Sequence, residues 1–267
     1  MKILVLGPHR GDAAFSLAVS MGNWLAAGHR VTILNVFSRS LYAPYSDAEF
    51  VHENDRLSYV SAMRRREDER FVQQVVNELP KAAKANLQMV DLNLKDAPLR
   101  LRCAQEDVCD LGVNPEDPAI GKLRKALDQQ VGAREVDALV LPLGLGEHVD
   151  HLTVRAAALP LTVKLPSAFY EDLPYAATHP SAATDLQVLR EETGAQLREE
   201  LQPVLNQRSD LGDAWKRRLM LGYASQIDDD EAARVGEFAA RYEGGERLWV
   251  NERWMEIAEA FRLSASA

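Results

Sequence analysis

The chain has 267 residues, of which 46% are hydrophobic and 27% charged, so it contains enough apolar material for a full core. Its formal net charge of -9 disfavours nucleic acid and anionic membranes as partners, because both require a concentrated basic face. No apolar run reaches the roughly 20 residues that cross a bilayer. We therefore expect a protein with no membrane span and no nucleic-acid partner.

The cysteine content and the N-terminus predict the compartment. Cys103 and Cys109 are too few for a secreted disulfide framework and are not spaced as a Cys-x-x-Cys pair. The opening "MKILVLGPH" lacks a full signal-peptide hydrophobic region followed by a small-residue cleavage site. We expect a cytoplasmic protein with two unpaired thiols.

The first 37 residues predict a strand–helix–strand unit. "KILVLG" (2–7) is a continuous apolar run, which is typical of a strand buried on both faces. A helix follows that Asp12 can cap and Gly28 can end. "RVTILNVF" (30–37) then predicts a second strand, parallel to the first.

The remaining elements continue to alternate between strand and helix. The sequence predicts strands at 87–94 and 137–146, an extended segment at 167–176, and helices at about 61–79, 119–131 and 151–159. From about residue 183 the chain reads as mostly helical. This order predicts an α/β fold with a mostly parallel sheet in a single domain, 1–267, with a helical C-terminal portion.

Polar side chains follow two of the buried strands. His9 and Asp12 come after the first strand, and "GEHVDH" (146–151) comes after the strand at 137–146. Ligands of open parallel sheets bind outside the carboxyl ends of the strands, so His148, Asp150 and His151 are expected to converge with His9 and Asp12. Each group alone also fits an ordinary polar turn that caps a helix.

Histidine and aspartate side chains together indicate a metal site. Two imidazoles and one carboxylate suit zinc and leave a fourth position for water or substrate. Zinc lowers the pKa of bound water to about 7 and polarises a carbonyl group. The remaining imidazole and carboxylate, His148 and Asp150, fit a histidine held in one tautomer that stabilises an oxyanion or protonates an amine.

Rival enzyme classes lack their motifs in this chain. There is no G-x-G-x-x-G of a dinucleotide-binding fold and no G-x-S-x-G of a serine hydrolase. A binding protein without catalytic activity stays open as an alternative, since fold alone does not decide function.

The two histidine motifs resemble those of the PIG-L/LmbE-like deacetylases. "GPHRGDAAFSLA" is similar to the opening signature Pro-His-Pro-Asp-Asp-Glu, and "HVDH" matches the second signature His-x-Asp-His. Weaker similarities extend through "RRREDERF", "KDAPLR", "FYEDLPYA" and "KRRLMLGYASQ", from residue 3 to about 226. The family removes acetyl groups from N-acetylglucosaminyl phosphatidylinositol and from sugar intermediates of low-molecular-weight thiols, and its fold is a Rossmann-like α/β sandwich.

The resemblance implies a role for several residues. The metal ligands, for zinc or another divalent ion, would be His9, Asp12 and His151. His148 would stabilise the tetrahedral intermediate and protonate the amine, with Asp150 orienting it. Arg64 and Asp96 fall near positions that contact the sugar. Arg10, which replaces a proline of the signature, is a further candidate for binding a substrate anion.

The chain departs from the family at Gly11, where the signature has the aspartate that acts as general base. Loss of a general base typically costs about 10²–10⁴-fold in rate. His148, Glu171 or Asp172 could replace it, or the chain could bind a sugar or metal without turnover. If the rest of the site is competent, Gly11→Asp is expected to raise activity.

The resemblance therefore implies a metal-dependent hydrolase that removes an N-acetyl or other N-acyl group from an amino-sugar conjugate. The alternative is a weakened or inactive relative that binds a sugar or a metal. The sequence does not name the sugar, and it leaves a homo-oligomer open.

Overall fold

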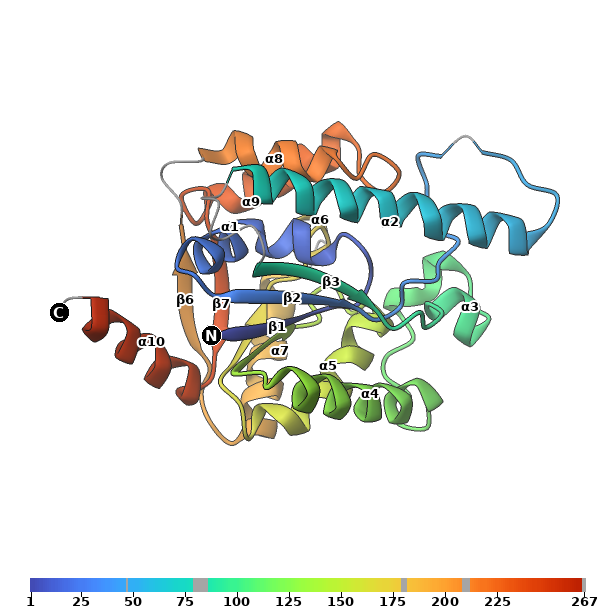
Figure 1. Cartoon of the computed structure of the whole chain (residues 1–267). Coiled ribbons are helices and arrows are strands. Elements are labelled where there is room, and N and C mark those ends of the chain that lie inside the picture. The colour runs from blue at the N-terminus through green and yellow to red at the C-terminus, as the bar shows by residue number, and fades with distance from the viewer. Residues whose placement is uncertain (47, 79–85, 179–181, 208–211, 266–267) are drawn as a thin grey trace.

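The computed structural model describes residues 1–46, 48–78, 86–178, 182–207 and 212–265. Seven strands form one sheet in the order β3-β2-β1-β4-β5-β7-β6. Figure 1 shows helices packed on both faces of this sheet. The predicted α/β class with a mostly parallel sheet is confirmed, whereas the division into a single domain stays a prediction.

Five neighbouring strands run parallel and lie within the segments predicted as strands or as extended, although four of them end earlier than predicted. They are β3 (Leu87–Asp91), β2 (Arg30–Asn35), β1 (Lys2–Gly7), β4 (Ala138–Pro142) and β5 (Ser167–Tyr170). In the two central strands, Leu4, Val5 and Val140 are completely buried. Burial of each such side chain contributes about 1.5–3 kcal/mol, which explains why these segments read as continuous apolar runs.

Two further strands come from the C-terminal part of the chain, which the sequence predicted as helical. β7 (Glu246–Val250) pairs antiparallel with both β5 and β6 (Gln202–Asn206). The expectation of a mostly helical portion from about residue 183 missed these two strands, although four helices also lie in this part of the described chain. β6 is an edge strand that starts Gln202-Pro203 and is mostly exposed, so it lacks the apolar run that reveals a buried strand.

The long helices form one layer on each side of the sheet. On one side lie α1 (Asp12–Ala26), α2 (Glu53–Asn77), α8 (Gly212–Leu221) and α9 (Asp229–Ala240). On the other side lie α4 (Pro118–Arg134), α5 (Val149–Thr162) and α7 (Ala182–Leu197). α10 (Glu252–Ala265) extends away from the sheet at the C-terminus (Figure 1).

Short helical segments occupy the loops near the carboxyl ends of the strands. They are α3 (Ala97–Leu101), the 3₁₀ segment η2 (Gln105–Cys109) and α6 (Tyr175–Thr178). α2 begins at Glu53 rather than near residue 61, and the predicted end at Leu79 lies outside the described residues. Among the helices described here, none has the length and apolar character needed to cross a membrane.

The strand order opens a crevice between β1 and β4. From β1 the chain moves outward to β2 and β3, and it then returns to place β4 on the other side of β1. The loops that leave the carboxyl ends of β1 and β4 consequently diverge, which is where open α/β sheets bind their ligands. These two loops carry the histidine motifs.

Candidate metal centre and substrate pocket

Three side chains from the two loops meet in the crevice. His9 follows β1, Asp12 is the first residue of α1, and His151 lies in the first turn of α5. One potential ligand atom from each lies within 4.8 Å of the others. The Asp12 Oδ2 atom is 3.4 Å from His9 Nδ1 and 3.3 Å from His151 Nε2. The structure thus brings together the three residues implied as metal ligands.

His151 presents a buried nitrogen that makes no hydrogen bond, although it lies near the Asp12 carboxylate. Its Nδ1 lies 2.6 Å from Asp172 Oδ1, so its Nε2 is the atom that faces Asp12. This Nε2 is buried and has no hydrogen-bond partner. Such an atom costs about 1–3 kcal/mol unless something binds it. Together with a histidine and a carboxylate, it fits the ligand set of a divalent cation.

Asp172, which follows β5, holds His151 in place. Its Oδ2 accepts hydrogen bonds from the backbone N–H groups of Gly144 and Leu145 at 2.8 and 2.9 Å. A carboxylate behind a histidine ligand fixes the tautomer of the ring and orients it toward the metal. The sequence considered Asp172 only as a replacement base. In the structure, however, its two oxygens are bound by His151 Nδ1 and by two backbone N–H groups, so it does not serve as that base.

The electrostatics of the cluster favour a cation. Burial opposes the charged form of Asp12, yet His151 and His9 hold the pKa of Asp12 well below its usual range. Burial also opposes the charged form of His151, but Asp12 and Asp172 outweigh it and raise the pKa of His151 to about 10. The carboxylates thus create a site for positive charge, which a metal ion satisfies by displacing protons.

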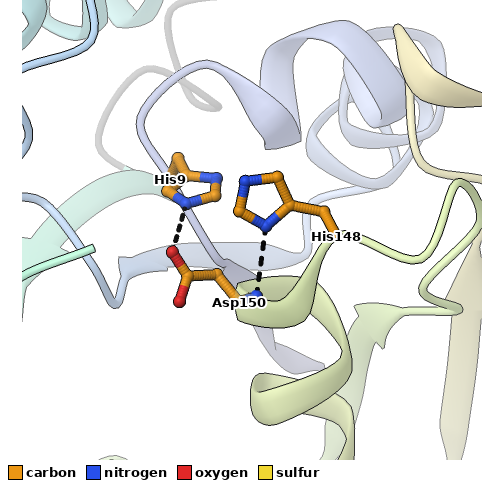
Figure 2. Close-up of side chains that lie close together, drawn as sticks. All are labelled: His9, His148 and Asp150. Atoms are coloured by element: carbon orange, nitrogen blue, oxygen red, sulfur yellow. Dashed lines mark hydrogen bonds and ion pairs between the residues drawn. The ribbon is translucent and has the colours of Figure 1, made fainter. Parts of the chain in front are cut away.

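The Asp150 carboxylate interacts with the His9 ring rather than with the His148 ring. Its Oδ2 lies 2.9 Å from His9 Nε2 and accepts the Ala97 N–H at 2.8 Å. Its Oδ1 accepts from Arg100 Nη1 at 2.7 Å. Figure 2 shows that the carboxylate points at the His9 ring and away from the His148 ring. The expectation that the Asp150 carboxylate orients His148 is therefore corrected.

His148 is oriented by the backbone instead. It is the N-cap of α5, and its Nδ1 accepts a hydrogen bond from the Asp150 N–H at 3.1 Å (Figure 2). Burial and the nearby His9 and His151 lower the pKa of His148 well below its usual value, so the ring is neutral at pH 7. With Nδ1 acting as acceptor, the single proton must reside on Nε2.

A second grouping of His9, His148 and Asp150 also has ligand atoms within 4.8 Å of one another. In that grouping, however, His148 Nδ1 and both Asp150 oxygens already accept hydrogen bonds. The grouping of His9, Asp12 and His151 contains the unpartnered nitrogen. We therefore assign the candidate metal centre to the latter set.

Gly11 adopts a backbone conformation that side chains disfavour. Its φ is +98°, and a Cβ built on it would lie 3.0 Å from the Phe15 ring and 3.4 Å from Gln226 Oε1. It is the N-cap of α1, whereas Asp12, which the sequence expected to cap that helix, accepts the His9 N–H at 2.7 Å. An aspartate at position 11 would therefore strain this turn, which argues against simple restoration of a base by Gly11→Asp.

The pocket beside the metal centre contains two of the three predicted substrate-binding residues. Arg64 and Asp96 line it together with His9, Asp12 and His148. Arg64 donates to the carbonyl of Arg10 at 2.9 Å and has a buried Nε without a partner. Asp96 caps α3 through the Leu99 N–H, and burial raises its pKa. Both are placed to contact a ligand.

Arg10 lies elsewhere, which corrects the expectation of a substrate-binding role. Its guanidinium is bound by Asp68 Oδ2 at 2.7 Å and Asp91 Oδ2 at 2.5 Å, and the residue is only 5% exposed. Asn35 donates to the same two carboxylates, and Tyr223 donates to Asp68. Two carboxylates already neutralise Arg10, so its charge is not available to a substrate anion.

Glu171 also lies outside the site. Its carboxylate accepts hydrogen bonds from Tyr242, Arg247 and Trp249 at 2.9, 2.6 and 3.1 Å. These donors lie at the β5–β7 side of the sheet, so Glu171 does not act as the replacement base that the sequence considered. Sequence reasoning also missed Arg100, the cation that binds Asp150, because nothing in "KDAPLR" signals its partner.

Comparisons with known proteins agree with this geometry. No family model matches the chain. The 2'-N-acetylparomamine deacetylase of Streptomyces fradiae is 29% identical over 260 residues, which cover 93% of this chain and 81% of that enzyme. The crystal structure of the zinc-inhibited form of teicoplanin deacetylase Orf2 is 20% identical with a TM-score of 0.67, covering 94% of this chain and 97% of that one.

A third match is the N,N'-diacetylchitobiose deacetylase of Pyrococcus horikoshii. It is 16% identical with a TM-score of 0.57, and the match covers 94% of this chain and 83% of that one. This chain has the fold of these deacetylases. The resemblance to the PIG-L/LmbE-like deacetylases that the two histidine motifs indicated is thereby confirmed for the fold.

Proposed function

We propose that this chain is a metal-dependent N-deacetylase that hydrolyses the acetamido group of an amino-sugar conjugate. The observation that carries the proposal is the buried, unpartnered Nε2 of His151, which faces Asp12 beside a pocket. The names of the relatives support it, since all three are deacetylases, of 2'-N-acetylparomamine, teicoplanin and N,N'-diacetylchitobiose.

His9, Asp12 and His151 are the residues that would hold the metal ion. A divalent ion bound there supplies Lewis acidity and makes water a better nucleophile at neutral pH. Asp172 keeps the His151 ring oriented, and Asp150 does the same for His9. Arg100 balances the charge of Asp150, which leaves the cluster ready for a cation.

His148 acts on the carbonyl oxygen of the substrate. Its neutral ring carries the proton on Nε2, and it lines the pocket next to His9 and Asp12. A fixed N–H donor in a site shielded from water stabilises the negative charge that develops on that oxygen. The Nε2–H of the ring donates a hydrogen bond to the carbonyl oxygen, and its Nδ1 already accepts the Asp150 N–H. His148 therefore stabilises the oxyanion and does not act as the general base.

Arg64 and Asp96 bind the sugar. Both side chains are nearly buried and line the pocket, so they offer a donor and an acceptor that are already ordered before the ligand arrives. The two cysteines are free, which supports action in a reducing, cytoplasmic compartment.

The experiment is acetate release from 2'-N-acetylparomamine and from N,N'-diacetylchitobiose. The protein is first stripped with a chelator and then reconstituted with zinc, manganese or cobalt, because a zinc-inhibited form of one structural neighbour exists. We expect release with at least one substrate, loss after chelation, and recovery with metal. A protein that binds one metal ion per chain but releases no acetate from either compound would instead be a sugar- or metal-binding relative.

A further inference from the structure

We propose that Gln226 accepts a hydrogen bond from the N–H of the acetamido group that is cleaved, so that this residue selects amides over esters. The inference rests on the proposed deacetylase function and deepens it, since it assigns a residue to the scissile bond. Three features of the structure carry it: the fixed orientation of the Gln226 amide, its free oxygen, and its place in the pocket that His148 also lines.

Glu67 of α2 fixes the orientation of the Gln226 side chain. Glu67 is 4% exposed, and its Oε2 accepts from Gln226 Nε2 at 2.9 Å and from Ser225 Oγ at 2.8 Å. Its Oε1 accepts from the Ser225 N–H at 2.8 Å. A carboxylate can only accept, so Gln226 must turn its nitrogen toward Glu67 and its oxygen away.

The oxygen of Gln226 has no partner among the described residues. Gln226 is only 9% exposed and lines the pocket with Asp12 and His148. Its Oε1 lies 3.4 Å from the point that a Cβ on Gly11 would occupy, directly beside Asp12 in the chain. This oxygen is accessible from the pocket, so it can accept a hydrogen bond from a ligand that supplies a donor.

The acidic side chains of the pocket each accept a hydrogen bond within the protein. Asp12 accepts the His9 N–H, Asp96 accepts the Leu99 N–H, and Glu231 accepts from Tyr45 Oη and the Asp228 N–H. Gln105 also lines the pocket, but no described hydrogen bond fixes its amide. Gln226 is therefore the amide of the pocket whose oxygen is held in a fixed orientation by a buried carboxylate.

Gln226 and His148 come from different parts of the chain and line the same pocket. Gln226 lies in the connection between α8 and α9, whereas His148 is the N-cap of α5. The pocket thus offers an acceptor on one residue and an N–H donor on the other. An acetamido group has one donor, its N–H, and one acceptor, its C=O, which matches this pair. An acetyl ester lacks the donor and leaves Gln226 unpaired.

The test compares an amide with an ester at the same position. We would measure kcat/KM of wild type and Gln226→Leu for 2'-N-acetylparomamine and for its analogue with a 2'-acetyloxy group. The variant should lose about tenfold to a hundredfold on the amide and change less than about threefold on the ester. The ratio of the two rates in one sample does not depend on the folded fraction.

Glu67→Gln tests the orienting role. An amide at position 67 can donate as well as accept, so the side-chain amide of Gln226 can also adopt the flipped orientation. We therefore expect a partial loss of the preference for amide over ester. Gln74→Leu is the matched control, because Gln74 is a glutamine of α2 outside the pocket, with a buried Oε1. It should leave the ratio unchanged.

Two outcomes separate this inference from the proposed function. If Gln226→Leu lowers kcat/KM for the amide and for the ester equally, or lowers neither, Gln226 does not bind the amide N–H. The proposed deacetylase function would still stand. If the metal-loaded wild type releases acetate from neither 2'-N-acetylparomamine nor N,N'-diacetylchitobiose, the proposed function fails and the assignment of Gln226 fails with it.

Discussion

Two clusters of charge flank the turn after β1, and they differ in whether they lie at the pocket. In the first, Arg10 is bound by Asp68 and Asp91, and Asn35 and Tyr223 donate further hydrogen bonds to these carboxylates. In the second, Asp12 faces His151 Nε2, a buried nitrogen that has no hydrogen-bond partner. Arg10 Nε has no hydrogen-bond partner either, but two carboxylates neutralise its guanidinium away from the pocket, whereas His9 and Asp12 of the second cluster line the pocket.

The contrast explains why adjacent residues have different roles. His9 and Arg10 are neighbours in the chain, yet His9 faces the pocket and Arg10 faces α2 and the end of β3. The Arg10 charge is balanced inside the protein and stabilises the fold. His151 Nε2 has no hydrogen-bond partner and is available as a ligand atom for a metal ion. The following variants break or sharpen this difference, from the largest expected effect to the smallest.

Arg10→Ala breaks the first cluster. It leaves the buried Asp68 and the partly buried Asp91 without their cation, and we expect the free energy of unfolding to fall by about 3–5 kcal/mol, measured by urea denaturation. Arg65→Ala is the control, because its partner Glu69 is exposed and the pair contributes less than about 1 kcal/mol. An Arg10→Ala protein that is as stable as wild type but no longer binds substrate would contradict this account and support a substrate-binding role for Arg10.

His148→Asn removes the oxyanion donor beside the second cluster. An asparagine side chain can still cap α5 by accepting the Asp150 N–H, so the fold should be unchanged. We expect kcat to fall by about 10²–10³-fold with the metal retained. Acetate release and metal content are measured on the same sample, and an unchanged kcat would exclude His148 from the chemistry.

Asp172→Asn weakens the support behind His151. The amide keeps the shape of the side chain but removes its negative charge and changes the hydrogen bonding to His151 and to the N–H groups of Gly144 and Leu145. We expect metal affinity to fall by about 10–100-fold, measured by competition with a chromogenic chelator. Equal affinity in wild type and variant would show that Asp172 supports the loop and not the ligand.

Gly11→Asp probes the turn between the clusters. Because Gly11 has a φ of +98° and little space next to Phe15, we expect a loss of about 1–3 kcal/mol in stability. Gly11→Ala is the control for the backbone strain. If Gly11→Asp is more active and as stable as wild type, the turn rearranges and an added carboxylate can serve as base.

Much of this arrangement could be predicted from sequence. The apolar runs of β1 and β4 located two buried strands, and the polar residues that follow each run located the rim where His9, Asp12 and His151 meet. These features are local, since each depends on a few consecutive residues and on the rule that parallel strands end at one edge.

The partners of these residues could not be predicted, because they depend on long-range packing. Arg10 finds Asp68 and Asp91 only after α2 and β3 dock, and the sequence favoured a solvated loop cation over one that binds a substrate anion. Likewise, Glu67 of α2 binds Ser225 and Gln226 in the connection between α8 and α9, far away in the sequence. The edge strand β6 was missed because it is mostly exposed and short.

The central claim is that His9, Asp12 and His151 form a metal centre. The most direct measurement is the metal content of the purified protein beside His151→Ala, after both are loaded with the same divalent ion and desalted. We predict one ion per wild-type chain and none in the variant, since the variant loses the unpartnered Nε2. Equal metal content in the two proteins, or none in the wild type, would contradict the account.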